Sequence, residues 1–117
     1  MPTIRDLVGA LRQREGVEAA VVLGRDGLLI DSQVIAGLDA EQVAALVPPV
    51  VLAADEFGAA TGHGALTTAV LEHPNGYAIL SALSAEAMLL VLAKPHAEIG
   101  QLLFELRRNR EHIASLV

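Results

Sequence analysis

The chain has no cysteine and no tryptophan, and its 117 residues include only two phenylalanines and one tyrosine. Without cysteine, it can form neither a disulfide framework nor a thiolate metal site. Few aromatic rings leave few platforms on which nucleic-acid bases could stack. Basic residues are scarce as well, because eight Lys and Arg face fourteen Asp and Glu, for a net charge of -6. A chain of this charge has little attraction for phosphate backbones, so we expect no nucleic-acid partner.

The sequence also lacks the long hydrophobic segments of secreted and membrane proteins. Residues 1–16 carry charges scattered along a helical pattern, whereas a signal peptide has a basic head followed by an apolar run. The longest uncharged stretch near the middle, Gln42 to Ala54, is too short to span a bilayer. We therefore expect a cytoplasmic protein without membrane insertion. Its hydrophobic fraction of 53% is enough for the core of a single domain over residues 1–117.

Hydrophobic periodicity and turn residues predict the element order α-β-β-α-β-β-β-α. Thr3 is suited to cap the first helix and Gly16 to end it, while Asp26-Gly27 provides the tight turn of a hairpin. The expected elements are a helix over residues 3–16, strands over 18–23 and 28–33, a helix over 38–62, strands over 66–72, 77–83 and 88–93, and a helix over 96–117. Pro48-Pro49 lies inside the second helix, where we expect either a kink or two short helices with proline opening the second.

The last two expected strands, 77–83 and 88–93, are apolar on both faces. An antiparallel strand with one face in water would instead alternate apolar with polar residues. The centre of the sheet should therefore be covered by helices on both sides, which predicts an α+β fold in three layers.

The second helix carries no charged or strongly polar side chain on any face from Val43 to Ala54. A helix that is apolar all round is buried all round, and a chain of this size has no second layer to cover the outer face. We expect the same helix of a second copy to cover it, across a two-fold axis. The alternative is that small Ala side chains simply face solvent, although such exposure is less favourable for Val47, Val50, Val51 and Leu52.

Three strings carry a family resemblance through their order and spacing. They are VVLGRDGLLI (Val21–Ile30), ALTTAVLEHPNGYAILSAL (Ala65–Leu83) and LLVLAKPHAEIGQLLFELRR (Leu89–Arg108). The last combines a strand, a Lys-Pro turn and an Ile-Gly-containing helix that ends in Leu-Arg-Arg. Over essentially its whole length, the chain resembles the Roadblock family, also called the dynein light chain roadblock-type family, in its short prokaryotic form.

This resemblance implies a five-stranded antiparallel sheet with the second helix on one face and the two terminal helices on the other. It also implies dimers that pair the second helix and the third strand, although Pro48-Pro49 interrupts this helix here. Family members bind or regulate small Ras-like GTPases or act as adaptors, and the bacterial gliding-motility regulator stimulates its partner GTPase without inserting an arginine. The dimer interface is then expected at Val43, Leu46, Val47, Val50, Val51, Ala54, Leu66, Thr68 and Val70.

No motif for catalysis or for cofactor binding stands out. The glycines of Thr61–Gly64 lack the GK[ST] of a phosphate loop and precede a strand, so a connecting loop is the better interpretation. Ser81 and Ser84 have no nucleophile-elbow context. Metal-binding spacing is absent among the four histidines, His63, His73, His96 and His112. We therefore expect a non-enzymatic protein without metal or cofactor.

Three arginines gather near the end of the chain. On a straight helix Arg107 and Arg108 point outward, with Glu111 and Glu105 at ion-pair spacing. This face is either a solvated, salt-bridged surface or a docking patch for an acidic partner. Arg110 falls in the apolar stripe, where we expect its stem on apolar surface at the edge of the sheet and its head in water.

The apolar residues after Arg110 extend beyond the expected sheet, and we expect this tail to contact a partner or the first helix. Expected partner-binding residues are Gln42, Asp55, Arg110, Ile113 and Leu116. Our first functional hypothesis is a homodimeric module that binds and regulates a small Ras-like GTPase. A passive adaptor of the same fold is the alternative. A small-molecule sensor of the PAS or GAF kind is more remote, because it would need a polar pocket.

Overall fold

The computed structural model describes residues 2–117 and has the expected α+β architecture. Its elements are α1 (Ile4–Arg12), β1 (Val17–Gly24), β2 (Leu29–Val34), α2 (Ala40–Ala45), α3 (Val47–Thr61), β3 (Thr68–His73), β4 (Gly76–Ala82), β5 (Ala87–Ala93), α4 (Ile99–Arg108) and α5 (Arg110–Ala114). The strands form one antiparallel sheet in the order β2-β1-β5-β4-β3. The hairpins β1–β2 and β3–β4 therefore flank β5, and β2 and β3 are the two edges.

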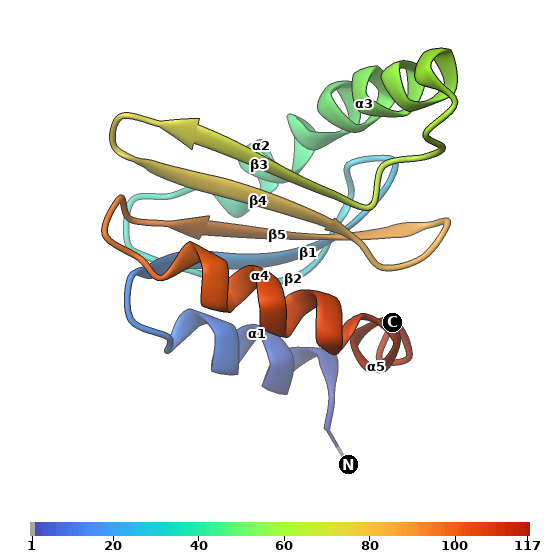
Figure 1. Ribbon diagram of the computed structural model, residues 1–117. Helices are drawn as coiled ribbons and strands as arrows, with labels where there is room; N and C mark the ends of the chain where they lie inside the picture. Colours follow the sequence, from blue (N-terminus) through green and yellow to red (C-terminus); the bar gives the residue numbers. More distant parts are fainter. Residues whose placement is uncertain (1) are drawn as a thin grey trace.

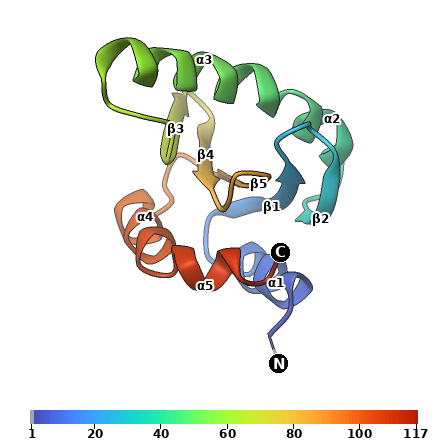
Figure 2. The same cartoon turned by 90° about the vertical axis from the view of Figure 1, so that its right-hand side faces the viewer.

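Helices cover both faces of this sheet, as the apolar strands predicted. Figure 2 shows α2 and α3 on one side and α1, α4 and α5 on the other, with the strands between them. Figure 1 shows the terminal helices α1 and α4 lying beside each other beneath the sheet. The fold thus confirms the three layers and the division of helices that the family resemblance implied.

The central strands β1, β4 and β5 are buried on both faces because each contributes side chains to two cores. On the side of α1 and α4, Val22, Ile79 and Val91 are fully buried. On the side of α2 and α3, Val21 and Leu80 pack in a second core. Adjacent residues of one strand point to opposite faces, so each apolar run fills both cores.

The first helix begins as the sequence predicted. The Thr3 hydroxyl accepts a hydrogen bond from the Asp6 backbone N–H at 3.2 Å, and the Asp6 carboxylate accepts one from the Thr3 N–H at 2.9 Å. The helix ends at Arg12 rather than at Gly16. Gly16 instead allows the turn into β1, because its φ is 84° and a Cβ atom there would lie 2.8 Å from the Cβ of Ala97.

The two prolines open a second helix rather than kinking one. Asp39 caps α2 through its carboxylate, which accepts from the Gln42 N–H at 3.2 Å. The chain then passes through Leu46 into α3, with Pro48 and Pro49 in the first turn. Backbone N–H groups in a first helical turn have no intrahelical partner, so proline costs little there.

The last expected helix, over 96–117, is wrong as a single element. The chain forms α4 and α5, separated by Asn109 with φ -103° and ψ 10°. The Asn109 side-chain amide donates to the Glu105 carbonyl oxygen at 2.8 Å. Such local side-chain bonds compete with the helical backbone, and the turn gives α5 a direction of its own (Figure 2).

Candidate functional site

The outer surface of α2 and α3 carries an apolar stripe, which we call the α3 stripe, made of the exposed Leu46, Ala53 and Phe57 and the half-buried Val50. Their spacing of three or four residues places them on one helical face. The side chains of Leu46 and Phe57 are 64% and 72% exposed, and Ala53 is also exposed. Single exposed apolar residues are ordinary, but a continuous stripe is typical of an interaction surface.

A neighbouring face of α3 packs on its own sheet. Val47 and Val51 are each only 5% exposed and belong to the core with Leu80 and Leu90. The helix can therefore bury one side in its own protomer while the α3 stripe stays uncovered. Two residues expected at the dimer interface, Val47 and Val51, contact the sheet instead.

The neighbouring edge strand β3 has backbone groups available for pairing. The Ala82 N–H donates to the Thr67 carbonyl oxygen at 2.9 Å, so this pair is hydrogen-bonded across the hairpin. Hydrogen-bonded and non-hydrogen-bonded pairs alternate along antiparallel strands. The backbone groups of Thr68, Val70 and Glu72 therefore point away from β4, toward the open edge.

An apolar groove connects the α3 stripe to this part of the sheet. It has a volume of about 130 Å³, and Leu46 and Val50 line it together with Leu71 of β3. Leu71 pairs with Ala78 on β4 and so lies on the same face as α3. The helix surface and the strand edge thus form one continuous surface.

The expected interface residues do not all lie on this surface. Val43, Leu46 and Val50 line the groove, and Ala54 and Leu66 line the hollow beside it. Thr68 and Val70 point to the other face of β3, because Val70 pairs with Ile79 in the core under α1 and α4. Only their backbone groups share the edge with the α3 stripe.

Sequence reasoning missed Phe57 and Leu71. It ended the uncharged apolar stretch of the second helix at Ala54, because Asp55 and Glu56 follow. The signal was nevertheless present, since Phe57 is seven residues after Val50 and therefore on the same face. Leu71 depended on the strand register, because a shift of one residue moves a side chain to the other face.

Asp55 is held inside the protomer by two other segments. Its Oδ1 accepts from the Leu66 N–H at 2.7 Å, and its Oδ2 lies 3.2 Å from Nη1 of Arg25 in the β1–β2 turn. Leu66 therefore lies in the loop rather than in β3, which begins two residues later than expected. Asp55 joins α3 to the β1–β2 hairpin and to the loop before β3.

Arg110 also has an internal partner, which corrects the expectation that its head lies in water. Its Nη2 donates to the Thr68 hydroxyl at 2.8 Å, across the sheet edge. Its Nε is buried and has no hydrogen-bond partner among residues 2–117. The turn at Asn109 produces this contact, because it directs α5 toward the start of β3.

The rest of the tail is mostly folded back on its own domain. Ile113 is 4% exposed and shares a core with Val8 and Leu11 of α1. Of the two expected contacts of the tail, a partner or the first helix, Ile113 therefore makes the second. Leu116 is half-buried. Gln42 on α2 is the one expected partner-binding residue that is exposed rather than half-buried or buried.

The outward arginines Arg107 and Arg108 are exposed as expected. The expected ion pair of Glu105 with Arg108 is not formed, because Glu105 pairs with Arg14 from the turn after α1. Among residues 2–117, no three His, Asp or Glu side chains gather closely enough to hold a metal ion.

The run Ala40–Thr61 is long and apolar enough to span a membrane by length and composition alone. In the fold it consists of two helices that meet at Leu46, and one side of α3 packs on the sheet. Lipid could surround this run only if α3 left its sheet. The exposed side is therefore better suited to a protein surface.

Comparison with known proteins agrees with this architecture. An uncharacterized protein of Methanocaldococcus jannaschii is 30% identical over 106 residues, which cover 91% of this chain and 92% of the relative. The structure of gliding protein mglB from Thermus thermophilus aligns with a TM-score of 0.84 at 14% identity, over 97% of this chain and 87% of the other. A Roadblock/LC7 domain from Streptomyces avermitilis aligns with a TM-score of 0.81 at 25% identity, over 92% of this chain and 91% of the other. The Roadblock/LC7 domain model matches residues 3–93. The chain belongs to the Roadblock/LC7 family.

Proposed function

We propose that this protein is a non-enzymatic homodimeric module of the cytoplasm that binds and regulates a small Ras-like GTPase. The observation that carries the proposal is the α3 stripe beside the open edge of β3. An apolar helix face and a strand edge with free backbone groups are both stabilised by a second copy of the same surface. Family membership and the likeness to gliding protein mglB support the regulatory role.

In the proposed dimer, the α3 stripe of one protomer packs against that of its partner, and the β3 strands pair across the two-fold axis. The backbone groups of Thr68, Val70 and Glu72 are the ones available for this pairing. Leu46 and Phe57 are then the most exposed side chains that the dimer would bury. This arrangement also buries the groove lined by Val50 and Leu71.

The exposed residue Gln42 on α2 lies next to the proposed dimer surface and is a candidate contact for the GTPase. Leu116 on the opposite layer remains a second candidate. The internal roles of Asp55, Arg110 and Ile113 make them supports of the fold instead. The family relationship favours a Roadblock module over the sensor of the PAS or GAF kind.

The two phenylalanines of the chain provide a matched test of the dimer. Phe57 is 72% exposed in the α3 stripe, and Phe104 is 59% exposed on α4 in the other layer. Light scattering after size-exclusion chromatography should give twice the 12.2 kDa chain mass for the wild type and for Phe104→Glu. Phe57→Glu should give a single-chain mass, because it places a charge in an apolar interface. A wild type that is monomeric at tens of micromolar concentration would refute the dimer.

A hydrolysis assay separates the two regulatory hypotheses. A small Ras-like GTPase encoded in the same genome is incubated with GTP in the presence and absence of this protein, and binding is measured in parallel. Faster hydrolysis supports a GTPase-activating role. Binding without any change in hydrolysis supports the passive adaptor, and absence of binding to every such GTPase contradicts both.

A further inference from the structure

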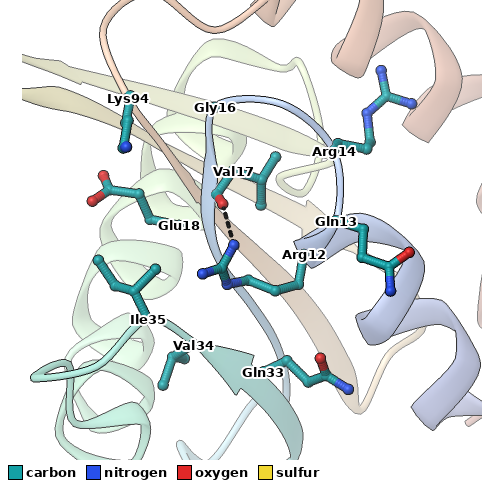
Figure 3. Close-up of a pocket in the computed structure, with 10 residues that line it drawn as sticks. All are labelled: Arg12, Gln13, Arg14, Gly16, Val17, Glu18, Gln33, Val34, Ile35 and Lys94. Carbon is teal, nitrogen blue, oxygen red and sulfur yellow. Dashed lines mark hydrogen bonds between the residues drawn. The ribbon is translucent and has the colours of Figure 1, made fainter.

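A second site lies at the other end of the sheet, beside β2. It is a hollow of about 630 Å³, within the range of roughly 300–1,000 Å³ typical of small-molecule sites. The end of α1, the start of β1, the end of β2 and Lys94 after β5 form its walls. Figure 3 shows Arg12 near its centre, with Lys94 and Glu18 on one side and Gln33 on another.

This hollow concentrates positive charge in an acidic protein. Three of the eight basic residues line it, namely Arg12, Arg14 and Lys94, whereas Glu18 is its only carboxylate. Arg14 is neutralised by Glu105 and turns away from the hollow in Figure 3. Among residues 2–117, neither Arg12 nor Lys94 forms an ion pair. Two cations are therefore available to a ligand.

Hydrogen bonds hold the walls of the hollow in place without a ligand. Arg12 Nη1 donates to the Val17 carbonyl oxygen at 2.9 Å, and this bond orients the guanidinium (Figure 3). The Lys94 N–H donates to the Gly16 carbonyl oxygen at 2.7 Å, and the Ile35 N–H donates to the Glu18 carbonyl oxygen at 3.0 Å. A site that exists before binding avoids the entropic cost of ordering it.

At Ser32, the adjacent β2 edge lacks one of the donors that an extended peptide would use. The bond between Ile35 and Glu18 shows that the backbone of Ser32 points away from β1, toward the edge. Its N–H is already used, because it donates to Asp31 Oδ1 at 2.8 Å. A peptide adding to β2 would find this donor occupied, which favours a small molecule as the ligand of the hollow.

We propose that this hollow binds a small molecule through a phosphate or carboxylate group held between Arg12 and Lys94. Guanidinium and ammonium groups donate charge-assisted hydrogen bonds to both kinds of anion. Gln33 also lines the hollow, on another side from Lys94. The Glu18 carboxylate repels a bound anion and so lowers the affinity of the hollow for it. The site is at the sheet edge opposite β3, and it does not depend on the proposed dimer or on the GTPase.

Pyrophosphate and citrate are suitable probes for a titration of the full chain at constant ionic strength. Backbone amide NMR shifts at Gly16, Ile35 and Lys94 should change and saturate with at least one probe. Lys94→Gln should weaken that binding on the order of tenfold, since it removes a charged donor. Glu18→Gln should strengthen it roughly threefold or more, because a like charge is lost. The backbone bond of Lys94 to Gly16 remains in Lys94→Gln, so the fold should be retained.

Arg108→Gln is the matched control, because it removes an exposed arginine on α4 far from the hollow. Saturation by pyrophosphate alone identifies a phosphate ligand, and saturation by citrate alone identifies a carboxylate ligand. Shifts that never saturate, or equal losses in Arg108→Gln and Lys94→Gln, overturn the proposal. Binding of hexaglutamate with no response to either probe also overturns it, in favour of an acidic segment of a protein.

Discussion

At the scale of single residues, two helical glycines illustrate how contacts decide what a position tolerates. A Cβ atom added to Gly58 in α3 would lie 1.8 Å from the carbonyl oxygen of Gly64, in the loop that follows the helix. The Gly58 carbonyl oxygen also accepts from the N–H groups of His63 and Gly64, at 2.8 and 3.2 Å. The chain therefore folds closely over Gly58, whereas a Cβ atom on Gly100 in α4 would meet nothing within 4 Å.

We predict opposite effects of alanine at these two glycines. Gly58→Ala should lower the free energy of unfolding by more than about 2 kcal/mol, because backbone must move to relieve the clash. Gly100→Ala should raise it by about 0.5–1 kcal/mol, because glycine loses more conformational freedom in a helix. Urea denaturation followed by circular dichroism measures both values. Equal effects in the two variants would contradict the close approach at Gly58.

At the scale of elements, the break at Asn109 determines the role of the C-terminal segment. On a straight helix, Arg110 would lie in the apolar stripe and Ile113 would extend past the sheet. The turn instead brings Arg110 to Thr68 and buries Ile113 near Val8 of α1. The short helix α5 thus connects the layer of terminal helices to the edge strand β3.

We predict that α5 contributes to stability mainly through Ile113. Ile113→Ala should cost about 2–4 kcal/mol of unfolding free energy, as for other large-to-small changes in a core. Val117→Ala is the control and should change it by less than about 0.5 kcal/mol, because Val117 is about half exposed, at the last position of the sequence. Thermal or urea unfolding provides the comparison. A negligible cost for Ile113→Ala would show that the tail does not pack on α1 in solution.

At the scale of the whole molecule, the two edges of the sheet differ in their capacity to associate. At β2, Asp31 Oδ1 accepts a hydrogen bond from the outward N–H of Ser32. The same oxygen lies 3.6 Å from Nη2 of Arg5 in α1. At β3, the outward backbone groups have no hydrogen-bond partner among residues 2–117, and the α3 stripe lies beside them. Edges that are blocked resist pairing and edges that are open favour it. We therefore expect the molecule to associate through β3 rather than through β2.

We predict that the thermal unfolding midpoint of the wild type depends on protein concentration. When unfolding is coupled to dissociation, each tenfold increase in concentration adds about 1.4 kcal/mol to the stability of the dimer. The unfolding midpoint should then rise by roughly 3–5 °C for each tenfold increase in protein concentration. Differential scanning calorimetry at several concentrations measures this slope. Phe57→Glu should abolish the slope and Phe104→Glu should retain it.

Much of the fold could be predicted because it follows from local pattern. The cap at Thr3, the proline-opened helix α3 and the strands that are apolar on both faces all depend on neighbouring residues or on a simple period. The site was less accessible to sequence reasoning. Phe57 and Leu71 were missed, and Asp55 was taken for a surface contact. Their roles depend on strand register and on ion pairs between segments far apart in the chain.

The sequence by itself determined the element order, the three layers and the presence of a long apolar helical segment before β3. These properties follow from the spacing of apolar residues, which repeats every two residues in a strand and every 3.6 in a helix. This spacing can be recognised in a short segment without the rest of the fold. Only the tertiary structure decided that Val51 packs into the core while Val50 lines a groove at its edge, and that Arg110 donates to a residue 42 positions away. It also assembled the hollow around Arg12 and Lys94 from separate segments. Such contacts depend on how the chain turns between elements, and residue spacing does not fix those directions.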